Sequence, residues 1–129
     1  MFSQVETAEI GIVLDETLLG VVDVKSRIRK GGILIINTAC KPEDTIVNGD
    51  FDVAVVDATG IAVKLRLTKE GAPLINTPML GAFAKATGIV SLANVEKALR
   101  GKLPAAAAAQ NFETVRAAYE GTVVNKAQG

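Results

Sequence analysis

Three short apolar runs constrain the fold of this 129-residue chain more than any other feature. They span residues 10–14, 33–36 and 51–56, and small polar residues follow each run directly. Near-continuous apolar runs of this length are typical of strands that are buried on both faces, as in parallel sheets. Helical patterns lie between and after these runs, among them one over residues 61–67. The sequence therefore predicts one α/β domain over residues 1–129: three layers (α/β/α), a mainly parallel sheet and C-terminal helices.

A fourth short strand and the helix after it form the best-defined local unit. The strand is expected at residues 72–75, and either Asn76 or Thr77 is expected to cap the helix, because short side-chain oxygens accept hydrogen bonds from first-turn amides. Pro78 suits the start of a helix, where its missing N–H has no partner to lose. Gly88 suits a left-handed stop. This unit is predicted to sit at the centre of the fold.

Further helices are expected in the C-terminal third. Ser91 is predicted to cap a helix over residues 91–103, whose apolar face repeats at Leu92, Val95, Leu99 and Leu103. Residues 111–119 are also helical in pattern, and the five alanines at 105–109 fit either a linker or the start of that last helix. The tail from Gly121 onward is expected to fray.

Composition removes several classes of function. The chain has no histidine, which is the commonest general base and metal ligand, and Cys40 is its one cysteine. We therefore expect no catalytic residue, no metal site and no iron–sulfur cluster on this chain. The 14 basic and 14 acidic residues cancel, which argues against a nucleic-acid surface. Neither a membrane-spanning run of roughly 20 apolar residues nor a signal-peptide pattern occurs, so a cytoplasmic setting is expected.

The polar residues at the ends of the predicted strands form the main candidate site. They occupy residues 15–17, 37–38, 57–60 and 76–77. Open α/β sheets bind ligands outside the carboxyl ends of their strands, and amides at helix starts can hold anions such as phosphate. Ordinary caps and turns use the same residue types. The pattern alone leaves both interpretations open.

Four segments, read in order, carry a further signal: GGILIINTACKPED, VVDATGIAVKL, NTPMLGAFAKATGIVSLANVEKAL and NFETVRAAYEGT. They resemble the gamma subunit of pyruvate:ferredoxin oxidoreductase, and equally the gamma-type subunit or domain of related 2-oxoacid:acceptor oxidoreductases. The resemblance runs over residues 9–120. None of the segments is a catalytic signature, so the specificity lies in the ordered set.

The resemblance implies a non-catalytic subunit of an enzyme that oxidatively decarboxylates a 2-oxoacid such as pyruvate. In that family the reaction uses thiamine diphosphate, iron–sulfur clusters carry the electrons to ferredoxin, and the acyl group ends on coenzyme A. The implied partners are the alpha, beta and delta subunits, with ferredoxin reached through the complex. The chain itself is expected to bind no cofactor alone and to support assembly and coenzyme A access.

The resemblance also implies a departure at the front of the chain. Gamma subunits of this family normally begin with a strand and a G-x-G-G-Q-G turn, and this chain begins after that unit. We therefore expect a truncated or split gamma chain, with an exposed sheet edge that a partner must cover. Because the missing turn is the family's best phosphate-binding candidate, the expected cofactor contacts that remain are Asn37, Thr38, Asn76 and Thr77.

Two other functions fit parts of the pattern. In a receiver-like signalling module, Asp57 would accept a phosphoryl group, Asp15 and Glu16 would hold magnesium, and Thr77 would be the switch hydroxyl. The strand and lysine that such modules need after Thr77 are missing. The other alternative is a structural domain that binds no ligand and serves assembly alone.

Overall fold

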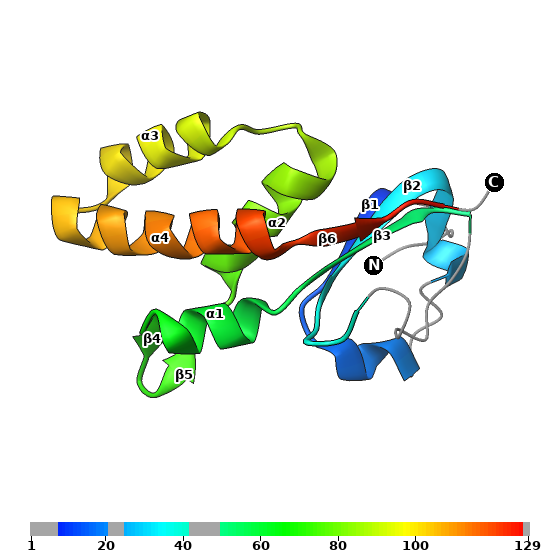
Figure 1. Cartoon of the computed structure of the whole chain (residues 1–129), viewed down its shortest axis with the longest axis horizontal. Helices are drawn as coiled ribbons and strands as arrows, with labels where there is room; N and C mark the ends of the chain where they lie inside the picture. Colours follow the sequence, from blue (N-terminus) through cyan, green and yellow to red (C-terminus); the bar gives the residue numbers. More distant parts are fainter. Residues whose placement is uncertain (1–7, 21–24, 42–49, 128–129) are drawn as a thin grey trace, which may run out of the picture.

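The structure is a computed structural model that describes residues 8–20, 25–41 and 50–127 (Figure 1). In chain order, the elements are β1 (Ala8–Val13), the 3-10 helices η1 (Glu16–Gly20) and η2 (Lys25–Arg27), β2 (Ile28–Asn37), β3 (Asp52–Val56), α1 (Ala58–Lys64), β4 (Thr68–Lys69), β5 (Ala72–Pro73), α2 (Asn76–Thr87), α3 (Leu92–Lys102), α4 (Ala105–Gly121) and β6 (Val123–Asn125).

The main sheet has the strand order β1-β2-β3-β6. The first three strands are parallel, and β6 returns antiparallel to β3. The ladder between β1 and β2 jumps from the pair Ala8–Ile28 to the pair Ile10–Ile33, so β2 bulges outward around its two glycines. One of these, Gly31, has φ +83°, a left-handed conformation that glycine adopts without steric cost. The predicted α/β class with a mainly parallel sheet is confirmed.

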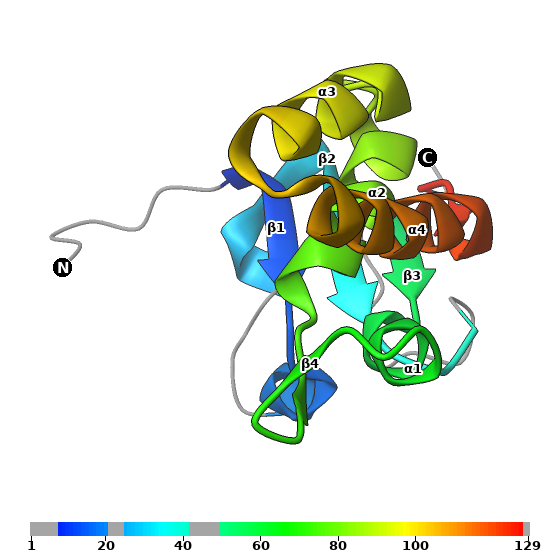
Figure 2. The same cartoon turned by 90° about the vertical axis from the view of Figure 1, so that its left-hand side faces the viewer.

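The sheet buries a different set of side chains on each face. On one face, Ile35 and Val56 pack against Met79 and Ala82 of α2 and against Ala118 of α4. On the other face, the cluster draws on alternate residues of the same strands, with Leu19 of η1 packed against it: Val13, Ile28, Leu34, Ile36, Phe51, Val53 and Val55. Burial on both faces explains why these strands read as continuous apolar runs. Figure 2 shows α2 and α4 in front of the sheet, which makes them the helical layer of the described fold.

Helices α2 and α4 approach each other very closely. A Cβ atom at Gly81 would lie 2.1 Å from the backbone oxygen of Val115, so no other residue fits there without moving α4. Farther along the pair, the Lys85 ammonium nitrogen lies 5.0 Å from the centre of the Tyr119 ring, within range of a cation–π interaction. Helix α4 ends at Gly121, and β6 begins two residues later at Val123.

The prediction of a fourth buried strand at residues 72–75 is wrong. Only Ala72–Pro73 forms a strand, and it pairs with β4 in a separate two-stranded hairpin. The turn is tight because Glu70 and Gly71 both have positive φ. Leu74 is 40% exposed, so this segment does not belong to the core of the sheet. A four-residue apolar segment fits a buried strand or an exposed hairpin equally well, and only packing distinguishes them.

The predicted cap of α2 is also wrong. Helix α2 starts at Asn76, its N-cap position is Ile75, and no side chain caps it. The Thr77 hydroxyl instead lies 3.2 Å from Asn111 Oδ1 on α4. The other signals in this region are confirmed: Gly88 ends α2 with φ 68°, and Ser91 Oγ accepts a 3.1 Å hydrogen bond from the Asn94 amide at the start of α3.

Three further expectations need correction. Helix α1 begins at Ala58 instead of residue 61, because Asp57 Oδ1 accepts a hydrogen bond from Gly60 N and caps it there. Residues 123–125 do not fray as expected, since they form β6 and pair with β3. In β1, Ile12 is 48% exposed because this strand lies at the edge of the sheet. The five alanines, by contrast, open α4, which is one of the two outcomes that the sequence left open.

Candidate functional site

The side chain of Asn37 ties together the carboxyl ends of the parallel strands. Its Nδ2 donates to Leu14 O at 3.0 Å and to Thr59 Oγ1 at 2.9 Å. Its Oδ1 accepts from Ala58 N at 2.9 Å and from Thr59 N at 3.3 Å. With four hydrogen bonds made and 7% of its surface exposed, Asn37 connects the end of β1 to the start of α1. Its polar atoms are occupied within the protein.

Thr38 is similarly engaged at the end of β2. Its backbone N–H donates to Val56 O at 2.9 Å, and its hydroxyl donates to Glu16 Oε2. The same hydroxyl oxygen accepts a 3.1 Å hydrogen bond from Cys40 N. Thr38 is 4% exposed, so it organises the loop that leaves β2 and links it to η1.

Two acidic residues at this end of the sheet, Asp15 and Asp57, act as local caps. Asp15 Oδ1 accepts hydrogen bonds from the Thr17 hydroxyl at 2.7 Å and from the Thr17 amide at 3.0 Å, and these bonds hold the pKa of Asp15 below its ordinary value of 3.8. Within residues 8–20, 25–41 and 50–127, no three acids, cysteines or histidines gather where they could hold a metal ion. This arrangement gives no support to the receiver-like alternative, which needs Asp57, Asp15 and Glu16 around magnesium.

The two polar residues at the start of α2 differ in their surroundings. Asn76 is exposed and lines an apolar groove of about 520 Å³, which also includes Ile12, Leu14, Met79, Leu80 and Phe83. Leu14 joins this groove to the Asn37 network, because its carbonyl oxygen accepts from Asn37. Thr77 bonds to α4 and belongs to the helical layer. The structure therefore brings Asn37, Thr38 and Asn76 to one end of the sheet and directs Thr77 elsewhere.

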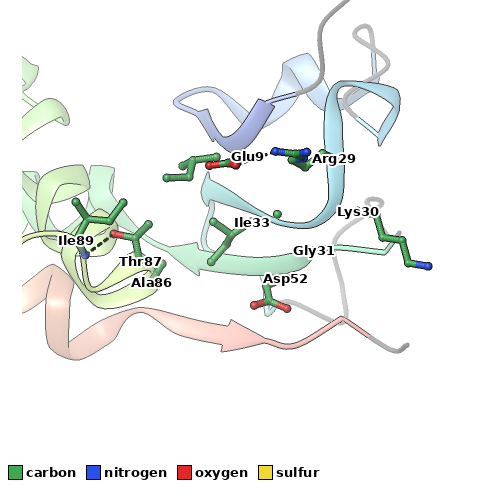
Figure 3. Close-up of a pocket in the computed structure, with 11 residues that line it drawn as sticks. Glu9, Arg29, Lys30, Gly31, Ile33, Asp52, Ala86, Thr87 and Ile89 are labelled. Atoms are coloured by element: carbon green, nitrogen blue, oxygen red, sulfur yellow. Dashed lines mark hydrogen bonds and ion pairs between the residues drawn. The ribbon is translucent and has the colours of Figure 1, made fainter.

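A second cavity, of about 470 Å³, lies at the amino ends of β1, β2 and β3 (Figure 3). Three of the four charged residues that line it are paired: Glu9, Arg29 and Asp52. Arg29 Nη1 lies 2.8 Å from Glu9 Oε1, and Asp52 Oδ1 accepts from Ala127 N at 2.8 Å while Lys126 Nζ lies 3.4 Å from its Oδ2. In Figure 3 the Lys30 side chain points away from the cavity. Mutual pairing leaves this cavity little free charge with which to select an ionic ligand.

Nothing in the sequence pattern indicated this second cavity. Glu9 and Arg29 are twenty positions apart and meet because β1 and β2 are paired. The two glycines of the β2 bulge, Gly31 and Gly32, also line this cavity. They lie within β2 itself, and Gly32 comes so close to Glu9 that a Cβ would lie 2.6 Å from its backbone oxygen.

Comparison with known proteins now identifies the family. The model of the family described as pyruvate ferredoxin/flavodoxin oxidoreductase matches residues 2–121. The chain belongs to this family. The resemblance that the ordered segments indicated is therefore confirmed.

Individual members of the pyruvate ferredoxin/flavodoxin oxidoreductase family align over most of the chain. The "Pyruvate/ketoisovalerate oxidoreductases common subunit gamma" of Thermococcus litoralis is 37% identical over 95% of this chain and 65% of its own length. The "Pyruvate synthase subunit PorC" of Methanothermobacter marburgensis is 39% identical over 91% of this chain and 62% of its own length. The chain thus spans slightly less than two thirds of these curated relatives.

A solved member of the family has the same fold. The crystal structure of the pyruvate oxidoreductase subunit PORC from Thermotoga maritima aligns with a TM-score of 0.77 and 32% identity. The alignment covers 97% of this chain and 69% of that one. In the described ranges, this chain combines a mostly parallel main sheet with four α-helices, which agrees with the predicted α/β class. No helix in the described ranges is long and apolar enough to cross a membrane.

Proposed function

We propose that this chain is a gamma-type subunit of a 2-oxoacid oxidoreductase that acts on pyruvate or a related 2-oxoacid. The observation that carries the proposal is the family match over residues 2–121, supported by the shared fold over 97% of the chain. The names of the relatives supply the substrate class: pyruvate for the Methanothermobacter protein, and pyruvate and ketoisovalerate for the Thermococcus protein.

The role proposed within the complex is assembly and coenzyme A access, not redox chemistry. The single cysteine in the sequence cannot supply the set of thiolates that an iron–sulfur cluster takes from its protein. Thiamine diphosphate and the clusters are therefore assigned to the alpha, beta and delta subunits. These subunits also pass electrons to ferredoxin. Coenzyme A is the cofactor of the complex that this chain is proposed to approach.

The residues at the carboxyl ends of the strands differ in how well they suit contact with coenzyme A. Asn37 and Thr38 are buried and hydrogen-bonded within the fold, so we propose that they shape this edge and do not touch a ligand. Thr77 bonds to Asn111. Asn76 is exposed and makes no side-chain hydrogen bond in the described part of the chain, so it is the proposed contact. The proposed contact is thus narrower than the set of four residues that the sequence predicted.

The test of the subunit role is native purification of the tagged chain from its source. Partners are identified by mass, and the fraction is assayed for viologen reduction that depends on a 2-oxoacid and coenzyme A. We expect thiamine- and cluster-bearing subunits together with activity, and the preferred oxoacid would name the substrate. A chain that elutes alone from an inactive fraction would contradict the proposal.

A separate titration tests the coenzyme A role. Adding coenzyme A to the purified complex should shift the NMR or fluorescence signal of a probe near Asn76, and Asn76→Ala should weaken that binding. Unchanged affinity in the variant, in a complex that remains active, would assign this chain to assembly alone.

A further inference from the structure

The end of α1 and the hairpin of β4 and β5 carry a cluster of positive charge. Lys64, Arg66 and Lys69 lie within six positions of one another, and all three are exposed. Glu70, at the turn of the hairpin, is the one acidic residue in the segment 58–75. The hairpin forms its own two-stranded sheet, and Figure 1 shows it beyond α1, on the side away from the main sheet. These charges therefore lie at one end of the molecule.

The cations of this cluster are not neutralised within the fold. None of the three has an ion-pair partner among the described residues, whereas Arg29, Arg100 and Arg116 each pair with a glutamate. The imbalance extends along the chain. Residues 61–121 contain eight lysines and arginines and four acidic residues, and residues 1–60 contain five and ten. The zero net charge of the chain thus combines an acidic first part with a basic second part, whose field attracts acidic groups.

The backbone of the cluster is held in an unfavourable conformation. Within the part of the chain that the structure describes, the non-glycine residues with positive φ are Arg66, at 59°, and Glu70, at 53°. Such residues keep this conformation only where surrounding contacts fix it, and they are often found at binding sites. Gln110 Nε2 of α4 donates a 3.1 Å hydrogen bond to Arg66 O. The next residue, Leu67, is 5% exposed and donates from its backbone N to Ala62 O at 2.8 Å. The backbone is therefore fixed before a partner binds, which reduces the entropy lost on binding.

Two exposed apolar side chains adjoin the cations. Val63 is 57% exposed and Leu74 is 40% exposed. Backbone hydrogen bonds tie both to the cluster, from Arg66 N to Val63 O at 3.2 Å and from Leu74 N to Leu67 O at 2.9 Å. Cations beside apolar groups suit a protein surface that offers carboxylates together with apolar contacts. Single-stranded nucleic acids also need aromatic side chains for base stacking, and residues 58–75 contain none.

We propose that this basic hairpin, formed by Lys64, Arg66 and Lys69 with Val63 and Leu74 beside them, docks an acidic surface of a neighbouring subunit in the oxidoreductase complex. Aspartate and glutamate carboxylates of that subunit pair with the three cations, and the Arg66 guanidinium donates two hydrogen bonds to one carboxylate. The inference rests on the proposed subunit role, which supplies the partner. The charge and geometry of the hairpin do not depend on which 2-oxoacid the complex oxidises.

A titration of the full chain tests the surface in the absence of other subunits. Polyglutamate is the probe, and NMR follows the backbone amides at low salt. We expect shifts that concentrate at residues 63–70 and at Gln110, and binding that weakens as salt is added, because salt screens exposed charges. No shifts, or shifts of equal size around Lys97 of α3, would overturn the inference. Binding of a DNA duplex at this surface that polyglutamate does not displace would assign the hairpin to nucleic acid instead.

Matched variants separate the charge of the hairpin from charge in general. Lys64→Gln combined with Lys69→Gln should weaken polyglutamate binding by about tenfold, because each exposed ion pair contributes a few-fold. Lys97→Gln combined with Lys102→Gln removes the same charge from α3 and should change the affinity by less than about twofold. Arg66→Asn should also weaken binding, since asparagine tolerates positive φ but lacks the guanidinium. Circular dichroism verifies that each variant folds, and equal losses in the two lysine pairs would contradict the proposal.

Zero-length cross-linking of the purified complex tests the partner. A carbodiimide joins the amine of a lysine to a carboxylate only where the two groups touch. We expect mass spectrometry to find Lys64 and Lys69 joined to aspartates or glutamates of another subunit. An intact, active complex without these cross-links would overturn the inference and leave the subunit role standing. A chain that purifies alone would contradict the subunit role and this partner, and the polyglutamate titration would then report separately on the hairpin.

Discussion

The side-chain nitrogen of Asn37 lies 2.9 Å from the hydroxyl oxygen of Thr59, across the end of the sheet from β2 to α1. The same asparagine accepts hydrogen bonds from the backbone of Ala58, which is fully buried. Asn37, which the sequence predicted as a ligand contact, thus holds the strand ends in place through its hydrogen bonds. Any ligand at this edge would meet a surface that Asn37 has shaped.

Replacing Asn37 by alanine should lower the free energy of unfolding by about 2 kcal/mol. The change leaves the buried amide of Ala58 without a partner, and an unsatisfied buried donor costs about 1–3 kcal/mol. Urea denaturation measures the effect. Asn94→Ala, at an exposed position of α3, is the control and should change stability by less than about 0.5 kcal/mol. If both variants lose the same free energy of unfolding, Asn37 does not hold the strand ends together as proposed.

Gly81→Ala should destabilise the fold by about 3 kcal/mol or more, because the new methyl group meets the backbone of Val115 and Tyr119, which cannot rotate away. Gly101→Ala in α3 is the matched control, since a Cβ there meets nothing within 4 Å. It should be neutral or stabilising by up to about 1 kcal/mol. Thermal unfolding measures the stability of both variants. If Gly81→Ala is as stable as the natural protein, α2 and α4 pack less closely than the structure shows.

Ser91→Ala should cost about 1 kcal/mol, because it removes the side-chain oxygen that accepts from the Asn94 amide at the start of α3. Asn76→Ala should change stability by less than about 0.5 kcal/mol, since no side chain caps α2. Chemical denaturation compares the two variants. If Asn76→Ala lowers the free energy of unfolding more than Ser91→Ala does, Asn76 caps α2 as the sequence predicted.

Thr17→Val should raise the pKa of Asp15 toward 3.8, because the Thr17 hydroxyl is the main cause of the lowered pKa. A carboxyl group whose pKa is lowered by folding stabilises the fold above its unfolded pKa, and loses this effect as the pH falls through the folded value. The advantage of the natural protein over the variant should therefore be present above pH 3.8 and vanish in more acidic solution. Carbon-13 NMR titration of the Asp15 carboxyl group measures the shift. An identical titration in the variant would contradict it.

Some of the site could be predicted from the sequence and some could not. The residues at the strand ends were found because parallel strands must bring their carboxyl ends to one edge, and Asn37 and Thr38 do lie there. Their role as internal ties could not be predicted, because it depends on Leu14 and Glu16, more than twenty positions away. The wrong strand at residues 72–75 has a similar cause, since a short apolar segment does not reveal which surface will cover it.

The sequence by itself determined the features that depend on neighbouring residues. Apolar runs set the central strands, Ser91 and Gly88 set helix ends, and the ordered segments indicated the family, because local sterics and hydrogen bonds act over a few positions. The tertiary structure decided which strand lies at the edge, which polar atoms are already satisfied and where an apolar groove remains. Those properties depend on which distant segments meet, and only the packed chain specifies that.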